Sequence, residues 1–167
     1  KWGYIDKSGN FVIAPQFDII EPFSEGLAAV KKNDKYGFID KKGKYVIALQ
    51  FDEAHDFSEG IAVVRLNGKM RYIDKIGNFA IKYQFDAAGS FSEGVALAQI
   101  EGKVGYINKS GNFVGKQLFD RIGYFSEGLA PVLKEGKCGY IDKTGEYVIA
   151  PQFEEVSDFS EGLAQVQ

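Results

Sequence analysis

The amino-acid sequence predicts an all-β repeat protein, and two observations lead to this fold class. The tetrapeptide Phe-Ser-Glu-Gly occurs five times at a constant spacing of 34 residues, with its serines at Ser24, Ser58, Ser92, Ser126 and Ser160. A fixed period of this length is typical of solenoids, propellers and other repeat arrays. Short apolar runs bounded by Gly, Asp, Asn or Pro indicate strands, and no segment has the apolar spacing of an amphipathic helix. We expect one domain, 1–167, with repeats 1–34, 35–68, 69–102, 103–136 and 137–167.

Each repeat is expected to contain three strands in an antiparallel meander. In the first repeat they are Trp2 to Asp6, Phe11 to Ala14 and Leu27 to Lys31. The first two are joined by Asp-Lys-x-Gly, in which the Asp side chain can accept a backbone hydrogen bond and the Gly supplies a positive φ. The same turn recurs at Asp40, Asp74 and Asp142, with Asn108 in the fourth repeat. A second short turn, such as Asn33-Asp34, leads into the next repeat.

The prolines place the Trp2 to Asp6 strand at the centre of each sheet. Pro15 and Pro151 lie at the end of the Phe11-type strand, Pro131 lies in the Leu27-type strand, and Pro22 lies in the linker. Because proline cannot donate to a strand ladder, it is confined to edges. The other two strands are therefore expected to be edge strands.

The recurring apolar positions predict a core between successive sheets. Each central strand carries an aromatic residue followed by Ile, as in Tyr4-Ile5, and adjacent strand residues face opposite ways. Both faces are thus expected to be buried between neighbouring repeats. The invariable alanine at the position of Ala28 indicates crowding, and we place its strand nearest a common axis. Phe17, Phe23 and their counterparts are expected to pack between sheets and not to line a ligand site.

The two ends of the chain lead to a prediction of ring closure. Five periods of 34 residues make 170, the chain has 167, and the three missing residues correspond to the turn Lys32-Asn33-Asp34. Pairing of Leu163 to Gln167 with Trp2 to Asp6 would leave no open edge, whereas an open array would leave Trp2 exposed on an unpaired strand. The predicted fold is a five-bladed, β-propeller-like toroid with three-stranded antiparallel blades, closed by pairing the C-terminal strand with the N-terminal strand.

Composition excludes several classes of partner. The formal charge of -3 and the interleaving of lysines with acidic residues argue against nucleic acid. No apolar run approaches the roughly 20 residues of a membrane span. The lone Cys138 cannot form an intramolecular disulfide, so the redox compartment is not indicated. The chain starts at Lys1 without Met, so we expect an excised or processed segment in which targeting signals would not be visible, and no localisation is indicated. We expect a monomer.

The repeat Lys-Trp-Gly-Tyr-Ile-Asp-Lys-x-Gly, followed by Phe-Val-Ile-Ala-Pro-Gln-Phe-Asp and Phe-Ser-Glu-Gly-Leu-Ala, closely resembles the WG or KWG repeat of bacterial proteins across the whole chain. The resemblance implies a bacterial source, propeller-like packing and a binding or scaffold role without enzymatic activity. Three positions depart from the pattern. Gly3 becomes Arg71 in the third repeat, and Gln16 becomes Leu118 in the fourth. The tryptophan occurs only at Trp2 and is replaced by Tyr36, Met70, Val104 and Cys138. That position is therefore a tolerant apolar slot.

The sequence offers little support for catalysis, and we predict no enzyme, cofactor or metal site. The only histidine, His55, lies in a linker, and the aspartates lack the spacing of an EF-hand. Five glutamates could form a ring at one mouth of a central channel: Glu25, Glu59, Glu93, Glu127 and Glu161. Glycoside hydrolysis needs two carboxyls in different environments, and five equivalent glutamates would have similar ones. We favour structural roles in turns; a ring for a cation or basic ligand, and catalysis, are the alternatives.

Two binding functions remain. A scaffold for a protein or peptide would use the linkers that differ between repeats, and its candidate residues are Glu53, His55, Arg121 and Glu155. A multivalent lectin-like module would instead bind glycans in equivalent pockets between blades and gain affinity through avidity. The sequence favours the scaffold, because the recurring polar residues already have roles in turns.

Overall fold

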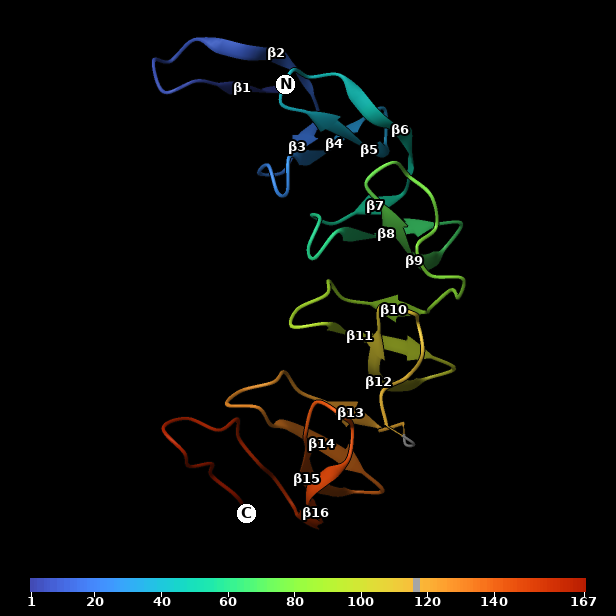
Figure 1. The fold of residues 1–167 in the computed structure, drawn as a ribbon, viewed down its shortest axis with the longest axis vertical. Coiled ribbons are helices and arrows are strands. Elements are labelled where there is room, and N and C mark those ends of the chain that lie inside the picture. The colour runs from blue at the N-terminus through green and yellow to red at the C-terminus, as the bar shows by residue number, and fades with distance from the viewer. Residues whose placement is uncertain (116–117) are drawn as a thin grey trace. The chain divides into compact units, whose positions relative to one another are not determined.

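The computed structural model describes residues 1–115 and 118–167, and within them every regular element is a strand. The strands are connected by tight turns and short irregular segments (Figure 1). The chain divides into two compact units, Lys1–Gly94 and Val95–Gln167. The described residues include no helix that could span a membrane. The prediction of an all-β chain is confirmed.

Unit 1 contains three small antiparallel sheets. The first pairs β1 with β2, the second has the order β3-β4-β5-β6, and the third has the order β7-β8-β9. The strands are β1 (Trp2–Ile5), β2 (Phe11–Phe17), β3 (Ile19–Ile20), β4 (Leu27–Lys32), β5 (Lys35–Asp40), β6 (Tyr45–Phe51), β7 (Glu53–Ala54), β8 (Ile61–Leu66), β9 (Lys69–Asp74) and β10 (Ala87–Ala88).

Unit 2 repeats the same pattern. It contains the antiparallel pair β11-β12 and a four-stranded sheet of order β13-β14-β15-β16. The strands are β11 (Val95–Ile100), β12 (Lys103–Asn108), β13 (Arg121–Ile122), β14 (Ala130–Lys134), β15 (Lys137–Ile141) and β16 (Tyr147–Phe153).

The predicted three-stranded blade is wrong, because the variable linker forms a fourth strand. Ile19 and Ile20 of β3 pair with Lys31 and Val30 of β4. The outer edge of β4 is therefore paired, and β4 is an internal strand and not the predicted edge. This pairing satisfies backbone groups of β4 that would otherwise lack partners in the sheet.

Pro131 is tolerated inside the internal strand β14 for a local reason. At this position β14 contributes its carbonyl, which accepts a hydrogen bond from the N–H of Gly123 at 2.8 Å. The carbonyl of Gly123 in turn accepts a hydrogen bond from the hydroxyl of Tyr106 at 2.6 Å. In a regular ladder the carbonyl of Gly123 would accept a hydrogen bond from the N–H of residue 131. The Tyr106 hydroxyl takes the place of that donor, so a proline, which has no N–H, is tolerated at position 131.

Burial on both faces of the central strand is confirmed. The adjacent residues Phe38 and Ile39 of β5 are both fully buried. Ile39 packs with Phe17 of β2, whereas Phe38 packs with Phe51 and Phe57 on the opposite face. Phe17 therefore lies between successive sheets, as predicted. The crowding at the invariable alanine is confirmed in four repeats, since Ala28, Ala62, Ala96 and Ala130 are at most 2% exposed, whereas Ala164 in the fifth repeat is half-buried.

The glycine that follows the tryptophan slot is required by a close approach of the backbone. A Cβ on Gly37 would lie 2.7 Å from the carbonyl oxygen of Ile47, where the register between β5 and β6 shifts. The third repeat has Arg71 at this position, and the expected strand after its Asp74 turn is missing. Only Phe79 and Phe85 form isolated bridges there, and the Arg71 guanidinium lies 3.7 Å from the centre of the Phe79 ring. An arginine cannot make the close approach seen at Gly37, but it is not the sole cause, because the described part of the fourth repeat keeps Gly105 and also lacks the strand.

The corresponding segment of the fourth repeat, 113–119, lies partly outside the described residues, because it includes positions 116 and 117. Its described part resembles that of the third repeat, because Phe113 and Phe119 bridge to Ile107 and Val104 without forming a strand.

Candidate functional site

Phe-Ser-Glu-Gly forms a two-residue hairpin turn. Ser24 and Leu27 exchange both backbone hydrogen bonds, at 2.8 and 3.0 Å. Between them, Glu25 has φ 51° and Gly26 has φ 91°, so both central residues are left-handed, as a type I′ turn requires. For a residue other than glycine this conformation costs roughly 1–2 kcal/mol. The other four glutamates have the same conformation: Glu59, Glu93, Glu127 and Glu161.

The carboxylate explains why glutamate occupies this strained left-handed position, because it binds the turn of the next repeat. Both carboxylate oxygens of Glu59 accept a hydrogen bond from the N–H of Gly94, at 3.1 Å. Glu25 makes the equivalent contact with Gly60 at 3.1 and 3.3 Å. In unit 2, Glu127 accepts from the N–H of Gly162 at 2.9 Å. Glycine at the glutamate position would relieve the strain but could not make this bond.

The serine and phenylalanine of the turn also connect elements. The Ser24 hydroxyl donates to the carbonyl of Phe57 at 2.7 Å, and Ser58 and Ser126 repeat this contact with Phe91 and Phe159. The Phe23 ring packs on Tyr4, with ring centres 4.8 Å apart. The recurrence of the tetrapeptide is thus explained by contacts within and between repeats.

Glu25 has an additional partner from the third repeat. The Lys75 ammonium lies 3.0 Å from a carboxylate oxygen of Glu25 and also donates to its backbone carbonyl at 3.3 Å. The hydrogen bond from Lys75, its positive charge and the N–H of Gly60 together lower the pKa of Glu25. A glutamate held in its ionised form is unsuited to act as a general acid near neutral pH.

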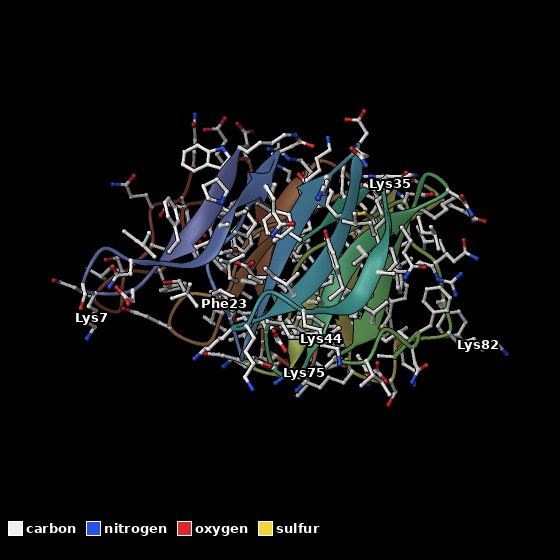
Figure 2. All side chains as sticks on the ribbon, turned by 90° about the horizontal axis from the view of Figure 1, so that it is seen from above. Lys7, Phe23, Lys35, Lys44, Lys75 and Lys82 are labelled. Atoms are coloured by element: carbon white, nitrogen blue, oxygen red, sulfur yellow. The ribbon has the colours of Figure 1, made fainter. Side chains whose placement is uncertain are left out.

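Lysines are otherwise spread over unit 1. Lys7 and Lys82 lie at opposite sides of the view in Figure 2, on turns far apart in the sequence. The lysine that opens each of the first four repeats pairs with the aspartate 17 residues later, as in Lys35–Asp52 at 2.6 Å and Lys69–Asp86 at 2.5 Å. Lys1–Asp18 and Lys103–Asp120 form the same ion pair. These recurring charges are therefore used within the repeats.

The linker candidates in unit 1 have local partners or lie exposed. Glu53 of β7 pairs with Arg65 across the strand pair, with 3.0 Å between Oε2 and Nε. His55 donates its backbone N–H to Val63 at 3.0 Å, and its side chain is exposed. The neighbouring Asp56 has a buried Oδ1 without a hydrogen-bond partner in the described part of the chain, and burial raises the pKa of this carboxyl.

The linker candidates in unit 2 come together at a cavity of about 420 Å³. Its lining includes Arg121 and Ile122 of β13, Pro131 of β14, Cys138 of β15, and Glu155 with Val156. The sequence indicated Arg121 and Glu155 but missed Cys138, although it is the smallest residue in the tryptophan slot. No sequence pattern marked this residue, because Trp2 in the same slot of the first repeat also lines a cavity.

A second cavity of about 430 Å³ occupies the equivalent place in the first repeat. It is lined by Trp2, Tyr4 and the linker residues 19–22. In residues 1–115 and 118–167, no three His, Cys, Asp or Glu side chains gather in an arrangement that could hold a metal ion.

The sheets and their repeating turns define an all-β repeat protein built from small antiparallel sheets. The model of the WG containing repeat matches five times, at residues 2–36, 36–69, 70–103, 105–138 and 139–167. The chain belongs to the WG repeat family. A comparison with curated proteins found no match.

Solved structures that resemble the chain are propeller-like. A crystal structure of a eukaryotic initiation factor has a TM-score of 0.57 at 14% identity, covering 99% of this chain and 55% of that one. Hsv2 from Kluyveromyces lactis has a TM-score of 0.43 at 9% identity, covering 77% and 45%. A protein of unknown function from Bacteroides caccae has a TM-score of 0.37 at 16% identity, covering 88% and 73%. The chain spans about half the length of the first two.

Proposed function

We propose that this chain is a non-catalytic binding module of a bacterial WG repeat protein, which recognises a protein or peptide through its linker strands. The proposal rests on one observation: the polar residues that recur in every repeat and those that differ between repeats have different roles. The recurring ones hold turns and neighbouring repeats together, as Glu59 does with Gly94. The residues that differ between repeats, such as Arg121 and Glu155, line a cavity. A single partner would recognise such differences.

A selection from a random peptide library displayed on phage, with the immobilised domain as bait, tests the proposal. We expect enriched peptides that bind in calorimetry with a stoichiometry of one per chain. A glycan array is screened in parallel. Failure to enrich any peptide, together with saturable glycan binding, would contradict the protein-binding function.

A lectin-like module is the second candidate, and the two cavities at equivalent places favour it. The cavity of the first repeat offers Trp2 and Tyr4, whose rings could stack on a sugar. The cavity in unit 2 has charged residues and a cysteine in the corresponding places. Calorimetry with a glycan from the array separates the candidates, because a lectin of this kind requires about five equivalent sites per chain, one for each repeat.

We further propose that five four-stranded blades close into a propeller-like ring by pairing of Leu163 to Gln167 with β1. Ile5 is 61% exposed and Leu163 is 77% exposed, whereas their counterparts Ile39 and Leu27 are buried. Closure would cover both side chains.

The test of closure is Ile5→Asp, with Val148→Asp, at another exposed strand position, as the control. Burial of one isoleucine contributes about 1.5–3 kcal/mol, so in a closed ring Ile5→Asp should lower the melting temperature by roughly 5–10 °C. Equal and small effects of the two substitutions would exclude closure.

A further inference from the structure

We propose that the cavity beside Cys138 binds an aromatic side chain of a partner peptide, and that Arg121 pairs with an acidic residue next to it. This inference rests on the proposed peptide-binding function and assigns it a place and a ligand chemistry.

The tryptophan slot of the repeat provides the first argument. In the second and third repeats this slot is filled: Tyr36 packs against the core cluster that contains Phe38, and Met70 is only 4% exposed. Cys138 is much smaller, and its thiol lies 3.5 Å from the carbonyl oxygen of Glu154, at the wall of the cavity. The space that Tyr36 and Met70 fill in the second and third repeats is therefore open here, as it is beside the exposed Trp2 of the first repeat. Its volume of about 420 Å³ is within the range of small-ligand sites.

The lining and the sheet edge provide the second argument. Ile122, Pro131 and Val156 present apolar surface to the cavity, which suits an aromatic ring. β13, which supplies Arg121 and Ile122, is an edge strand of its four-stranded sheet. An extended peptide can lie along such an edge and insert alternate side chains into pockets.

Charge at the rim provides the third argument and orients the ligand. Arg121 is exposed, and within the described residues its side chain has no carboxylate partner. Glu154 is near Lys137, at 4.0 Å, whereas the exposed Glu155 has no ion-pair partner in the same part of the chain. A ligand with an acidic group for Arg121 and a basic group for Glu155 would complement both. The preferred motif is therefore an acidic, an aromatic and a basic residue in succession.

The sole cysteine provides a site-specific assay. The probe is the peptide acetyl-Asp-Trp-Lys-amide, and its control is acetyl-Asp-Ala-Lys-amide. We expect the tryptophan peptide at saturation to slow alkylation of Cys138 by iodoacetamide at least fivefold, and the alanine peptide to leave the rate unchanged. Arg121→Gln should raise the concentration needed for half protection about tenfold, as expected for loss of one charged contact. Equal protection by both peptides, or none at 10 mM, would overturn the proposal.

Matched variants separate this site from the general function. In calorimetry Cys138→Ala should bind the tryptophan peptide as the wild type does, whereas Cys138→Tyr, which introduces the residue that fills the slot in the second repeat, should not bind it. Circular dichroism confirms that both variants are folded. Peptides enriched by phage selection that bind Cys138→Tyr as well as wild type would exclude this cavity while leaving the binding function intact. Failure to enrich any peptide would instead count against the function itself.

Discussion

The hydrogen bond between the Glu59 carboxylate and the next repeat leads to the prediction that glycine is a better substitute than alanine at this position, the reverse of the usual preference. At Glu59, replacement by alanine keeps the left-handed conformation, φ 54°, and removes the bond to Gly94. Replacement by glycine removes the same bond but also relieves the strain. Glycine should therefore be the better substitute, although in regular strands it is usually worse than alanine.

The expected magnitudes follow from the geometry. A hydrogen bond to a charged acceptor contributes about 1.5–3 kcal/mol, and the partial exposure of Glu59 favours the lower limit. Glu59→Ala should therefore cost about 1.5 kcal/mol and lower the melting temperature by roughly 3–6 °C. Relief of about 1 kcal/mol of strain should bring Glu59→Gly close to wild type.

Urea unfolding followed by circular dichroism measures these differences, and Glu135 supplies the matched control. Glu135 has φ 51° in a Glu-Gly turn of the same kind, and its carboxylate accepts no hydrogen bond within the described residues. Glu135→Ala should be nearly neutral, and Glu135→Gly should stabilise by about 1 kcal/mol. The reasoning is refuted if alanine and glycine at position 59 have equal effects, or if alanine costs the same at both positions.

Three further predictions follow. Gly37→Ala should destabilise by about 2–3 kcal/mol, because its Cβ would lie 2.7 Å from the Ile47 carbonyl oxygen; an unchanged urea midpoint would contradict the close approach. Arg71→Gly should leave hydrogen exchange of amides 79–85 fast, because the described part of the fourth repeat lacks the strand although it keeps Gly105; slowed exchange would show that Arg71 alone prevents the strand. Asp56→Asn should stabilise the protein at pH 7, because burial raises the folded-state pKa of Asp56 and ionisation therefore costs stability as pH rises through that pKa. This gain should disappear below about pH 4, where the carboxyl is protonated in both states, and a gain independent of pH would exclude ionisation as its origin.

Local turns and the alternation of apolar residues could be predicted from the sequence, because their interactions lie within a few residues. Asp6 accepts hydrogen bonds from the N–H groups of Ser8 and Asn10, at 2.8 and 3.0 Å, and Gly9 has φ 83°, as the Asp-Lys-x-Gly pattern indicates. The adjacent pair Phe38 and Ile39 indicated the burial of both faces, since neighbouring strand residues face opposite ways.

The remaining features depend on contacts between repeats, which leave no local pattern. A strand as short as Ile19–Ile20 has no periodicity to detect, and it is a strand only because β4 offers a free edge. The hydrogen bond between Glu59 and Gly94 joins residues 35 positions apart. The sequence of the five identical tetrapeptides therefore could not show whether their glutamates bind a ligand or hold neighbouring repeats together. The cavity beside Cys138 likewise depends on tertiary structure, because β13 and the linker residues Glu155 and Val156 come together only when successive repeats pack. The sequence alone thus determined strands, turns and repeat length, and tertiary structure decided how one repeat holds the next, because those bonds form only once the sheets are packed.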